Sequence, residues 1–558
     1  MEIKSKQVDV IPMINHYIEE MGLHEIFDRY IPNTHNADIK PAQVYCTMIT
    51  NILVASKPLY KIEEFFVDYM DGRTETPELA TKYNDDRCAR DTDRLYQADR
   101  HSMMLDAVAS AIHVHNLETD TIHNDSTSLT FSGAYHEQSE EAVQLEHGYN
   151  KDHRPDHKQI VFGLNITEDG HVPIGYEAYN GSTADSATHQ PNWDALRDFL
   201  GKEDFIYVAD CKLSSRDNLN HIHNNGGTFI TLLPKNIKEI KQFIVQVKEG
   251  EIIDWDMGYS VPAKTKKDKD TVYQIYDNEV SVDGYRIIWV HSNRKDIQDQ
   301  TTRERRLSKA EKQLQELSGK LNQYYLKTHQ QIENAVKKIT TGLSDQLHIE
   351  INEESSVESV QVGRGRAGEN TQYKEVITIT YSLKWSRNDE IIERESRADG
   401  LFPLITNSKE LSAVDVLKTY KQQPFLEKRF QTGKSILEVA PVFLKKNERI
   451  EATVFLFFIA LMIVSLIERN IRQQMKKKVI ESLPILPTGL KTKSPTWNNI
   501  QYFFRSIYLG IIMEGDKIIR EQVKGVTKLH KEVLALLKVP ISRYENLKDY
   551  WWELEFAT

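Results

Sequence analysis

Cysteine is scarce in this chain: there are 3 among 558 residues, and Cys46, Cys88 and Cys211 lie far apart. Thiols so few and so scattered exclude a disulfide framework, and they also exclude a zinc site built on Cys-x2-Cys pairs. Reduced thiols are typical of proteins that stay in the cytoplasm, so we expect this protein to act there.

An excess of positive charge is also missing. Lysine and arginine together number 71 against 82 aspartates and glutamates, which gives a net charge of −11. This balance excludes a uniformly basic nucleic-acid binder. Any contact with DNA must therefore come from local basic patches.

Hydrophobic runs long enough to cross a bilayer are lacking. The longest apolar run, the 16 residues from Ala452 to Ile467, is flanked by Glu451 and Glu468. A membrane-spanning helix needs about 20 apolar residues, so this run predicts a buried core helix. A nucleotide-binding P-loop is absent as well, because Lys428 stands where the first glycine would precede TGKS at 432–435.

What the sequence does contain is a set of acids in informative surroundings. In YKQQPFLEKRFQTGK, Tyr420, Gln423, Glu427 and Lys434 stand at i, i+3, i+7 and i+14. A single α-helix would place all four on one face, and such a mixture indicates a binding face instead of a core stripe. One glutamate performs no chemistry alone, so further acids are needed.

Two further acids follow strand-like runs. Asp125 lies in DTIHNDSTSLTF and Asp210 closes FIYVAD. Carboxylates that converge from distant segments are the ligands that Mg²⁺ or Mn²⁺ prefers. A pair of such ions clamps the attacking and leaving oxygens of a phosphoryl displacement.

These residues resemble the DDE transposases of bacterial insertion sequences, in the insertion-sequence-four superfamily. That family carries Tyr-x2-Arg-x3-Glu-x6-Lys around its glutamate; Tyr420, Glu427 and Lys434 match it, and Gln423 stands where the arginine belongs. Four other segments are similar to the family: NDST around Asp125, GYNKDHRPDHKQIVFGL at 148–164, VADCKLSS around Asp210 and ADGLFPLITN at 398–407. The resemblance extends from about residue 8 to residue 475.

The resemblance implies cut-and-paste DNA transposition by metal-dependent phosphodiester hydrolysis and strand transfer. It implies two Mg²⁺ or Mn²⁺ ions per active site, held by Asp125, Asp210 and Glu427. The implied partners are double-stranded DNA with terminal inverted repeats, target DNA and a second copy of the chain in a synaptic homodimer. The implied setting is the nucleoid of a bacterial or archaeal cell.

DNA-binding residues follow from the same resemblance and from local charge. Six residues are candidates for contacts with DNA: Tyr420, Gln423, Lys434, Lys151, Arg154 and Lys158. The last three lie in KDHRPDHK, which joins two strands beside Asp125, and their cations suit backbone phosphates.

Two departures from the family pattern leave alternatives open. Gln423 removes a cation that Arg429 could replace, and Pro424 is awkward inside a helix. If Pro424 occupies the first turn, Glu427 stays helical and Tyr420 lies outside. Glu451 is the fallback third acid. The competing functions are a catalytically impaired, transposase-derived DNA-binding protein and a metal-dependent nuclease without strand transfer.

The order of elements indicates an α/β fold. Strands are expected at 121–123, 159–167, 171–180, 205–210 and 228–234, with helices at 190–200 and 214–225. This order resembles that of a ribonuclease-H-like mixed sheet flanked by helices, the fold that the family shares. Five regions follow: a helical N-terminal domain (1–118), the first part of the catalytic core (119–235), an α+β insertion (236–404), the second part of the core (405–475) and a helical C-terminal region (476–558).

Three features within these regions have two alternative interpretations each. The N-terminal helices either read the ends of a DNA element or cap the catalytic domain. The helix at 303–324 has apolar residues at heptad spacing, which fits a coiled coil or a hairpin with 328–341. Trp255, Trp289 and Trp385 in the insertion either stack a flipped base or lie in the core.

Overall fold

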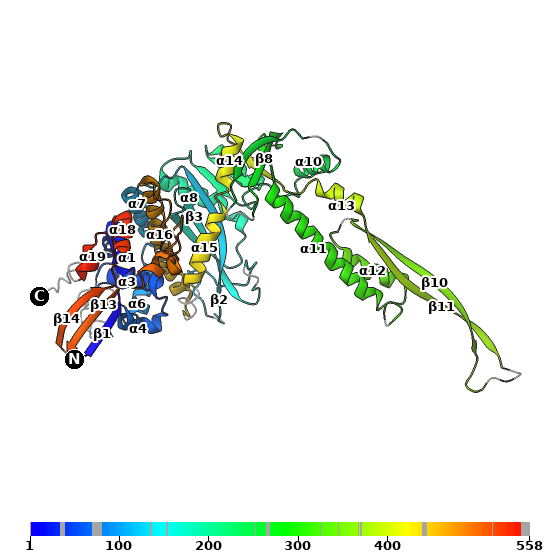
Figure 1. Cartoon of the computed structure of the whole chain (residues 1–558), viewed down its shortest axis with the longest axis horizontal. Coiled ribbons are helices and arrows are strands. Elements are labelled where there is room, and N and C mark those ends of the chain that lie inside the picture. The colour runs from blue at the N-terminus through cyan, green and yellow to red at the C-terminus, as the bar shows by residue number, and fades with distance from the viewer. Residues whose placement is uncertain are drawn as a thin grey trace. The chain divides into compact units, whose positions relative to one another are not determined.

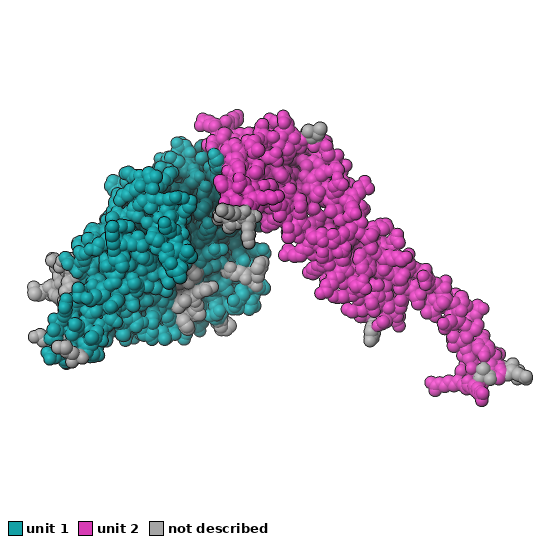
Figure 2. Space-filling model, in the orientation of Figure 1, with its two compact units in different colours: residues 1–231, 418–558 teal, residues 232–417 magenta. Residues whose placement is uncertain are grey.

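The computed structural model describes most of the chain. The described residues are 2–33, 39–69, 81–133, 135, 137–151, 154–251, 253–263, 268–323, 325–343, 345–366, 368, 371–437, 444–515 and 517–547. The chain divides into two compact units (Figure 2). The first consists of residues 1–231 and 418–558, and the second of residues 232–417.

The first unit begins with helices where helical spacing predicts them. They are α1 (Ile11–Glu20), α2 (Leu23–Tyr30), α3 (Pro41–Val54), α4 (Ile62–Asp68), α6 (Asp85–Gln97) and α7 (Arg100–His115). Proline at the first position starts α3, and the side chains of Asn84 and Asp99 cap α6 and α7. Every residue of α3 is buried, so this helix lies in the core of the unit.

A small sheet joins the two ends of the chain. Strand β1 (Glu2–Gln7) pairs antiparallel with β13 (Tyr508–Glu514), which pairs antiparallel with β14 (Lys517–Lys524). The expectation of a helical C-terminal region is therefore wrong for residues 508–524. A hairpin forms there because two β-prone runs flank Gly515, which has a positive φ of 60°. Helices α17 (Trp497–Phe504), α18 (Lys528–Leu537) and α19 (Ser542–Glu545) surround the hairpin in sequence.

The central sheet of the first unit has the predicted order of elements. Its strands are β2 (Thr121–Phe131), β3 (Lys158–Thr167), β4 (Pro173–Tyr179), β5 (Ile206–Ala209) and β6 (Thr228–Leu232), in the spatial order β4-β3-β2-β5-β6. β2, β3 and β4 pair antiparallel, whereas β2, β5 and β6 pair parallel. Helix α8 (His189–Leu200) connects β4 to β5, and α9 (Arg216–Asn224) connects β5 to β6.

The apolar run at 452–467 lies inside helix α16 (Asn447–Lys477), as predicted for a core helix. α16 is long and apolar enough to cross a membrane, but 94% of its most apolar window is buried against the rest of the protein. It packs against α3, α6, α18 and β4. Glycine at position 433 allows close approach to this helix, because a Cβ there would lie 2.6 Å from the ring of Phe457.

The segment around Glu427 forms two helices instead of one. α14 (Ala413–Tyr420) ends at Tyr420 and α15 (Pro424–Leu437) begins at Pro424. The expectation that Tyr420, Gln423, Glu427 and Lys434 share one helical face is therefore wrong. Proline disfavours a helical conformation in the residue before it and lacks the N–H that a continuous helix would need, so the chain turns at residues 421–423.

The second unit contains an antiparallel sheet and a helical hairpin. The sheet has the order β12 (Leu401–Thr406), β9 (Arg286–Ser292), β8 (Thr271–Val280) and β7 (Asp256–Val261). Helix α10 (Lys238–Lys248) places Phe243 against Trp289, with ring centroids 4.1 Å apart. Trp289 is 1% exposed, so this tryptophan lies in the core.

The long polar helix forms a helical hairpin, which is one of the two alternatives that its sequence left open. α11 (Asn293–Ser318) packs against α12 (His329–Thr340), and both share a hydrophobic cluster with the ribbon of β10 (Leu347–Gln361) and β11 (Tyr373–Arg387). Helix α13 (Asp389–Ser396) follows the ribbon (Figure 1).

Candidate functional site

Asp125 lies in the middle of β2, with its side chain 20% exposed. The backbone N–H of Ser126 donates to Asp125 Oδ1 at 2.7 Å. Burial raises the pKa of Asp125 to about 6; Lys151 works against this shift, and the negative charge of Asp210 adds to it. Two of the three predicted acids are therefore close enough to repel each other.

Asp210 follows the last residue of β5. Because β2 and β5 run parallel and Asn124 pairs with Ala209, the residues after these two, Asp125 and Asp210, occupy neighbouring positions. Burial raises the pKa of Asp210, while a hydrogen bond from the Lys212 N–H (2.9 Å) and the charge of Lys151 lower it.

A third carboxylate, Asp185, belongs to this cluster and was not predicted. It starts the short 3-10 helix Asp185–Ala187 before α8, and Ser126 Oγ donates to its Oδ1 at 2.7 Å. Asp185 also raises the pKa of both Asp125 and Asp210. Its only local signal was a polar loop, NGSTADS, which does not distinguish a site residue from a solvated turn.

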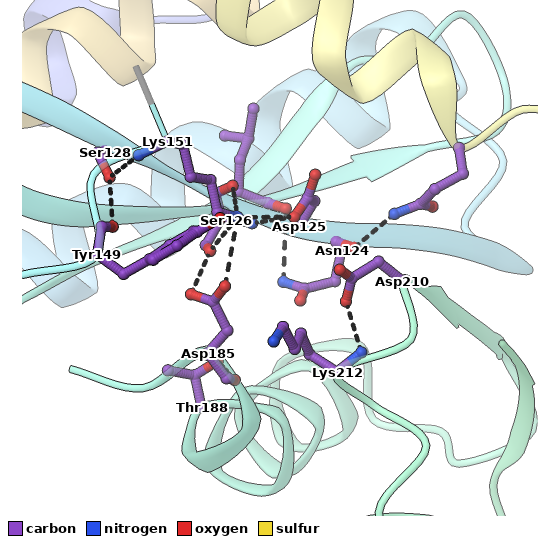
Figure 3. A network of polar contacts seen from close by, with 12 residues as sticks. Asn124, Asp125, Ser126, Ser128, Tyr149, Lys151, Asp185, Thr188, Asp210 and Lys212 are labelled. Carbon is purple, nitrogen blue, oxygen red and sulfur yellow. Dashed lines mark hydrogen bonds and ion pairs between the residues drawn. The ribbon is translucent and has the colours of Figure 1, made fainter. Parts of the chain in front are cut away.

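Lys151 supplies the positive charge among these acids (Figure 3). Its Nζ lies 3.5 Å from Asp125 Oδ1 and 3.4 Å from Asp185 Oδ2, and it donates to the carbonyl oxygen of Ser126 at 2.6 Å. Burial lowers the pKa of Lys151, but Asp125, Asp185 and Asp210 outweigh it and the net shift is upward. The ammonium group therefore compensates the acids, and a contact with DNA phosphate stays a prediction for this residue.

Tyr420 and Glu427 come from a distant part of the sequence, at the end of α14 and in the first turn of α15. Glu427 is exposed in the first turn of α15, where the helix dipole favours a carboxylate. Burial raises the pKa of the partly buried Tyr420, and the charges of Asp210, Asp125 and Glu427 contribute to the same shift. One phenol thus lies near all three predicted acids.

Gln423 points into the protein. It is 8% exposed; its Oε1 accepts from His123 Nδ1 at 2.9 Å, and its Nε2 donates to the Asn124 carbonyl at 2.8 Å. His123 and Asn124 directly precede Asp125, so Gln423 fastens the turn before α15 to the strand that carries the first acid. Both ends of the Gln423 amide are therefore bonded inside the protein, and a contact of this residue with DNA stays a prediction.

The other predicted DNA-binding residues lie at the surface. Lys434 stands two turns beyond Glu427 on α15 and is half-buried. Arg154 is exposed and contacts His157 Nε2 at 2.6 Å, and Lys158 Nζ donates to the Tyr135 carbonyl at 2.9 Å. Arg429, the alternative cation, forms an ion pair with Glu468 at 2.7 Å. Glu451, the alternative third acid, forms an ion pair with Arg100 at 2.6 Å.

In the described part of the chain, no three His, Cys, Asp or Glu side chains are arranged to share one metal ion. The donor chemistry nevertheless suits a hard divalent cation, because Asp125, Asp185 and Asp210 offer only oxygen, and the charge of Asp185 raises the pKa of both Asp125 and Asp210. Neighbouring carboxylates repel one another even with Lys151 and Lys212 as counter-charges, and a divalent cation would relieve that repulsion.

The raised pKa of Asp125 leads to a prediction about stability. Between about pH 4 and pH 6 the folded chain holds a proton on Asp125 that the unfolded chain has released, so stability falls as pH rises through this window. We expect Asp125→Asn to raise the free energy of unfolding by about 2–3 kcal/mol at pH 7.5. At pH 4 the same substitution should leave the free energy of unfolding nearly unchanged. Urea unfolding of both proteins at the two pH values measures this difference.

A matched control for this test is Asp198→Asn on α8, whose carboxylate is 69% exposed and pairs with Arg197. Its effect should be below about 0.5 kcal/mol at either pH. An Asp125→Asn protein that is no more stable than the wild type at pH 7.5 would contradict the prediction.

The fold and the site together define an α/β protein with a cluster of partly buried carboxylates on neighbouring strands. A family model described as a domain of unknown function, DUF4277, matches residues 3–109, in the N-terminal part of the chain. No curated protein matches the sequence.

Among solved structures, the chain is similar to a piggyBac transposase, seen in a synaptic complex with hairpin DNA. The two sequences are 9% identical, and the match covers 90% of this chain and 83% of the other, with a TM-score of 0.38. This score is too low to establish a shared fold.

Proposed function

We propose that this protein is a DDE transposase that excises and inserts a DNA element by metal-dependent phosphodiester hydrolysis and strand transfer. The observation that carries the proposal is the shared electrostatic environment of Asp125, Asp210 and Tyr420. The charge of Asp210, at the end of β5, raises the pKa of Asp125 in β2, and the charges of Asp210, Asp125 and Glu427 all raise the pKa of the Tyr420 phenol.

The arrangement of the first unit supports the proposal. A ribonuclease-H-like core has its first acid on the first strand and its second after the fourth, and Asp125 and Asp210 occupy those positions on β2 and β5. Glu427 lies on a later helix, in agreement with the third position.

Two Mg²⁺ or Mn²⁺ ions, held by Asp125, Asp210 and Glu427, would supply activation of water and of a 3′-hydroxyl as nucleophiles toward a phosphodiester. The protein's own residues then bind and orient the DNA. Lys434 lies on the same face of α15 as Glu427, and Tyr420 lies beside the acids, so both suit phosphates near the scissile bond. Arg154 and Lys158 would contact phosphates of the DNA backbone farther from the scissile bond.

The proposed partners are double-stranded DNA with terminal inverted repeats, target DNA and a second copy of the chain when two ends are joined. We expect the purified chain, given Mg²⁺ or Mn²⁺ and a plasmid carrying the DNA that flanks its gene, to release the bounded segment and to join it to a second plasmid. Binding without cleavage would favour the DNA-binding alternative. Cleavage without joining would favour the nuclease alternative.

A further inference from the structure

The second unit contains a hollow of about 640 Å³ that the proposed function does not use. Helices α10 and α11 contribute most of its lining (Figure 1). The residues between α12 and β10, the end of α13 and the residues that follow it contribute the rest, together with Lys235. A volume of this size lies within the usual range of small-molecule sites, about 300–1,000 Å³.

Each of the two helices turns one face toward the hollow. The lining residues are Lys241, Ile244, Val245 and Lys248 on α10, and Asp299, Thr302, Arg303 and Arg306 on α11. Both sets follow the spacing i, i+3, i+4 and i+7, which places side chains along one side of a helix. The hollow is therefore built mainly from two regular helical faces.

The acids and the cations of this lining are not equally partnered. Each of the three acids forms an ion pair: Glu395 with Lys248, Asp399 with Arg303, and Asp299 with Lys295. Among the residues that the structure describes, three exposed cations form no ion pair and no side-chain hydrogen bond, namely Lys235, Lys241 and Arg306. The hollow therefore has a surplus of positive charge.

The surroundings of Lys235 agree with that surplus. Desolvation lowers the pKa of Lys235, and the charge of Lys295 adds to this shift. A negative charge placed in the hollow would favour the charged form of Lys235. An anion is therefore the ligand that these side chains suit.

Gln346 adds a buried amide to the lining. It is 7% exposed, and no described group bonds to its Oε1. Its backbone N–H donates to the Leu343 carbonyl at 2.9 Å, and its own carbonyl accepts from the Asn388 N–H at 3.0 Å, so the residue is held in place. A buried acceptor without a donor is unfavourable. A ligand that donates an N–H or O–H to Gln346 Oε1 would remove this cost.

Apolar side chains supply the third property of the hollow. Ile244 and Val245 are neighbours on α10, and Val245 is 54% exposed although it is apolar. Leu343, which is 5% exposed, belongs to the same lining. A fitting ligand therefore combines negative charge, an apolar face and a hydrogen-bond donor.

We propose that this hollow binds a nucleoside di- or triphosphate. The phosphates pair with the three unpartnered cations, the base covers the apolar side chains, and an amino or hydroxyl group of the nucleoside donates to Gln346 Oε1. A DNA duplex presents its phosphates on a convex surface and would leave that buried oxygen without a donor. The proposal does not rest on the proposed function, because the hollow belongs to the second unit, whereas Asp125, Asp210 and Glu427 belong to the first.

The test is calorimetric titration of the full chain with the four ribonucleoside triphosphates and with inorganic tripolyphosphate. EDTA is present throughout, so that no divalent cation can carry a nucleotide to the acids of the first unit. We expect at least one nucleotide to bind with a dissociation constant between about 1 μM and 1 mM. Tripolyphosphate, which has the charge but neither a base nor a sugar, should bind at least about fivefold more weakly.

Paired charge removals test the cations. We expect Lys241→Ala/Arg306→Ala to weaken nucleotide binding at least about tenfold, because it removes one unpartnered cation from each helix. The matched control is Lys238→Ala/Arg305→Ala, which removes an exposed lysine from α10 and an exposed arginine from α11 outside the lining. It should bind nucleotide as the wild type does.

Gln346→Leu tests the amide. It should weaken nucleotide binding at least about fivefold and leave the affinity for tripolyphosphate unchanged. It should not lower the melting temperature, because Gln346 Oε1 has no described partner to lose.

Four results would overturn the proposal. They are no nucleotide binding up to about 1 mM, equal affinity for nucleotides and tripolyphosphate, equal loss of binding in the control pair, and unchanged nucleotide affinity in Gln346→Leu. A Lys241→Ala/Arg306→Ala protein that binds duplex DNA more weakly but nucleotides as the wild type does would also overturn it, and would assign these cations to DNA.

Discussion

Alanine at Asp125, Asp210 or Glu427 is expected to lower DNA cleavage by at least about a thousandfold in each case, equivalent to about 4 kcal/mol of transition-state stabilisation. Under the proposed function each acid holds a divalent cation, so losing any one removes a ligand that the other two do not replace. Cleavage of an end-labelled duplex in Mg²⁺ measures the loss. Binding of the same duplex without divalent cation should stay within about twofold of the wild type.

Two control variants separate chemistry from folding in this experiment. Asp198→Ala removes an exposed carboxylate from α8 and should cleave as the wild type does. Glu451→Ala removes the alternative third acid, which pairs with Arg100 and accepts from the Val143 N–H at 2.9 Å. It should reduce stability more than cleavage per folded molecule. Full cleavage by Glu427→Ala together with loss in Glu451→Ala would transfer the third position to Glu451.

Local patterns in the sequence were sufficient for most strands and helices around the site, but β2 continues to Phe131, beyond the predicted strand at 121–123, so Asp125 lies within it. The apolar runs of β3 and β5 and the spacing of α8 depend on neighbours within a few residues, and each element formed where predicted. The proximity of Asp125 and Asp210 follows from the parallel pairing of β2 and β5, which the order of elements implied.

Local sequence patterns could not predict contacts between distant segments. Asp185 joins the cluster only because Ser126 Oγ and Lys151 reach it from β2 and from the loop before β3. β1 forms because residues about 500 positions later in the chain present an open strand edge to it. Neither segment has a pattern of its own that separates it from a polar loop or a short tail.

The break at Pro424 explains the remaining error in the site. Spacing alone placed Gln423 beside Glu427, but the turn at 421–423 directs Gln423 inward to His123 and the backbone of Asn124. An arginine at this position would bring a buried cation beside a buried histidine. Glutamine satisfies both neighbours without charge, which gives a physical reason for the departure from the family pattern.

Arg429 offers the second large expected effect, because it is a buried cation on the helix that carries Glu427. It is 5% exposed; its Nη1 pairs with Glu468 Oε2 at 2.7 Å, and its other nitrogens donate to the carbonyls of His171 (2.9 Å) and Gly170 (3.0 Å). Arg429→Met would leave two carbonyls without their donor and Glu468 with less compensation. We expect the free energy of unfolding to fall by about 3–5 kcal/mol in urea.

The control is Lys428→Met on the next position of α15, which removes the same charge from an exposed site over the ring of Phe425. It should cost less than about 1 kcal/mol. A double variant, Arg429→Met/Glu468→Gln, should lose less than the sum of its two single changes, because removing both charges leaves no uncompensated ion in the core.

DNA binding distinguishes this structural role from the one that the sequence suggested for Arg429. A phosphate contact would make Arg429→Met bind DNA more weakly, with a salt dependence reduced by about one charge, while stability stayed unchanged. An anchor between α15, the turn after β3 and α16 gives the opposite pair of results: unchanged salt dependence of binding and a large loss of stability. The burial of Arg429 and its three protein partners favour the anchor, and α15 then holds Glu427 in place through a residue that never contacts the substrate.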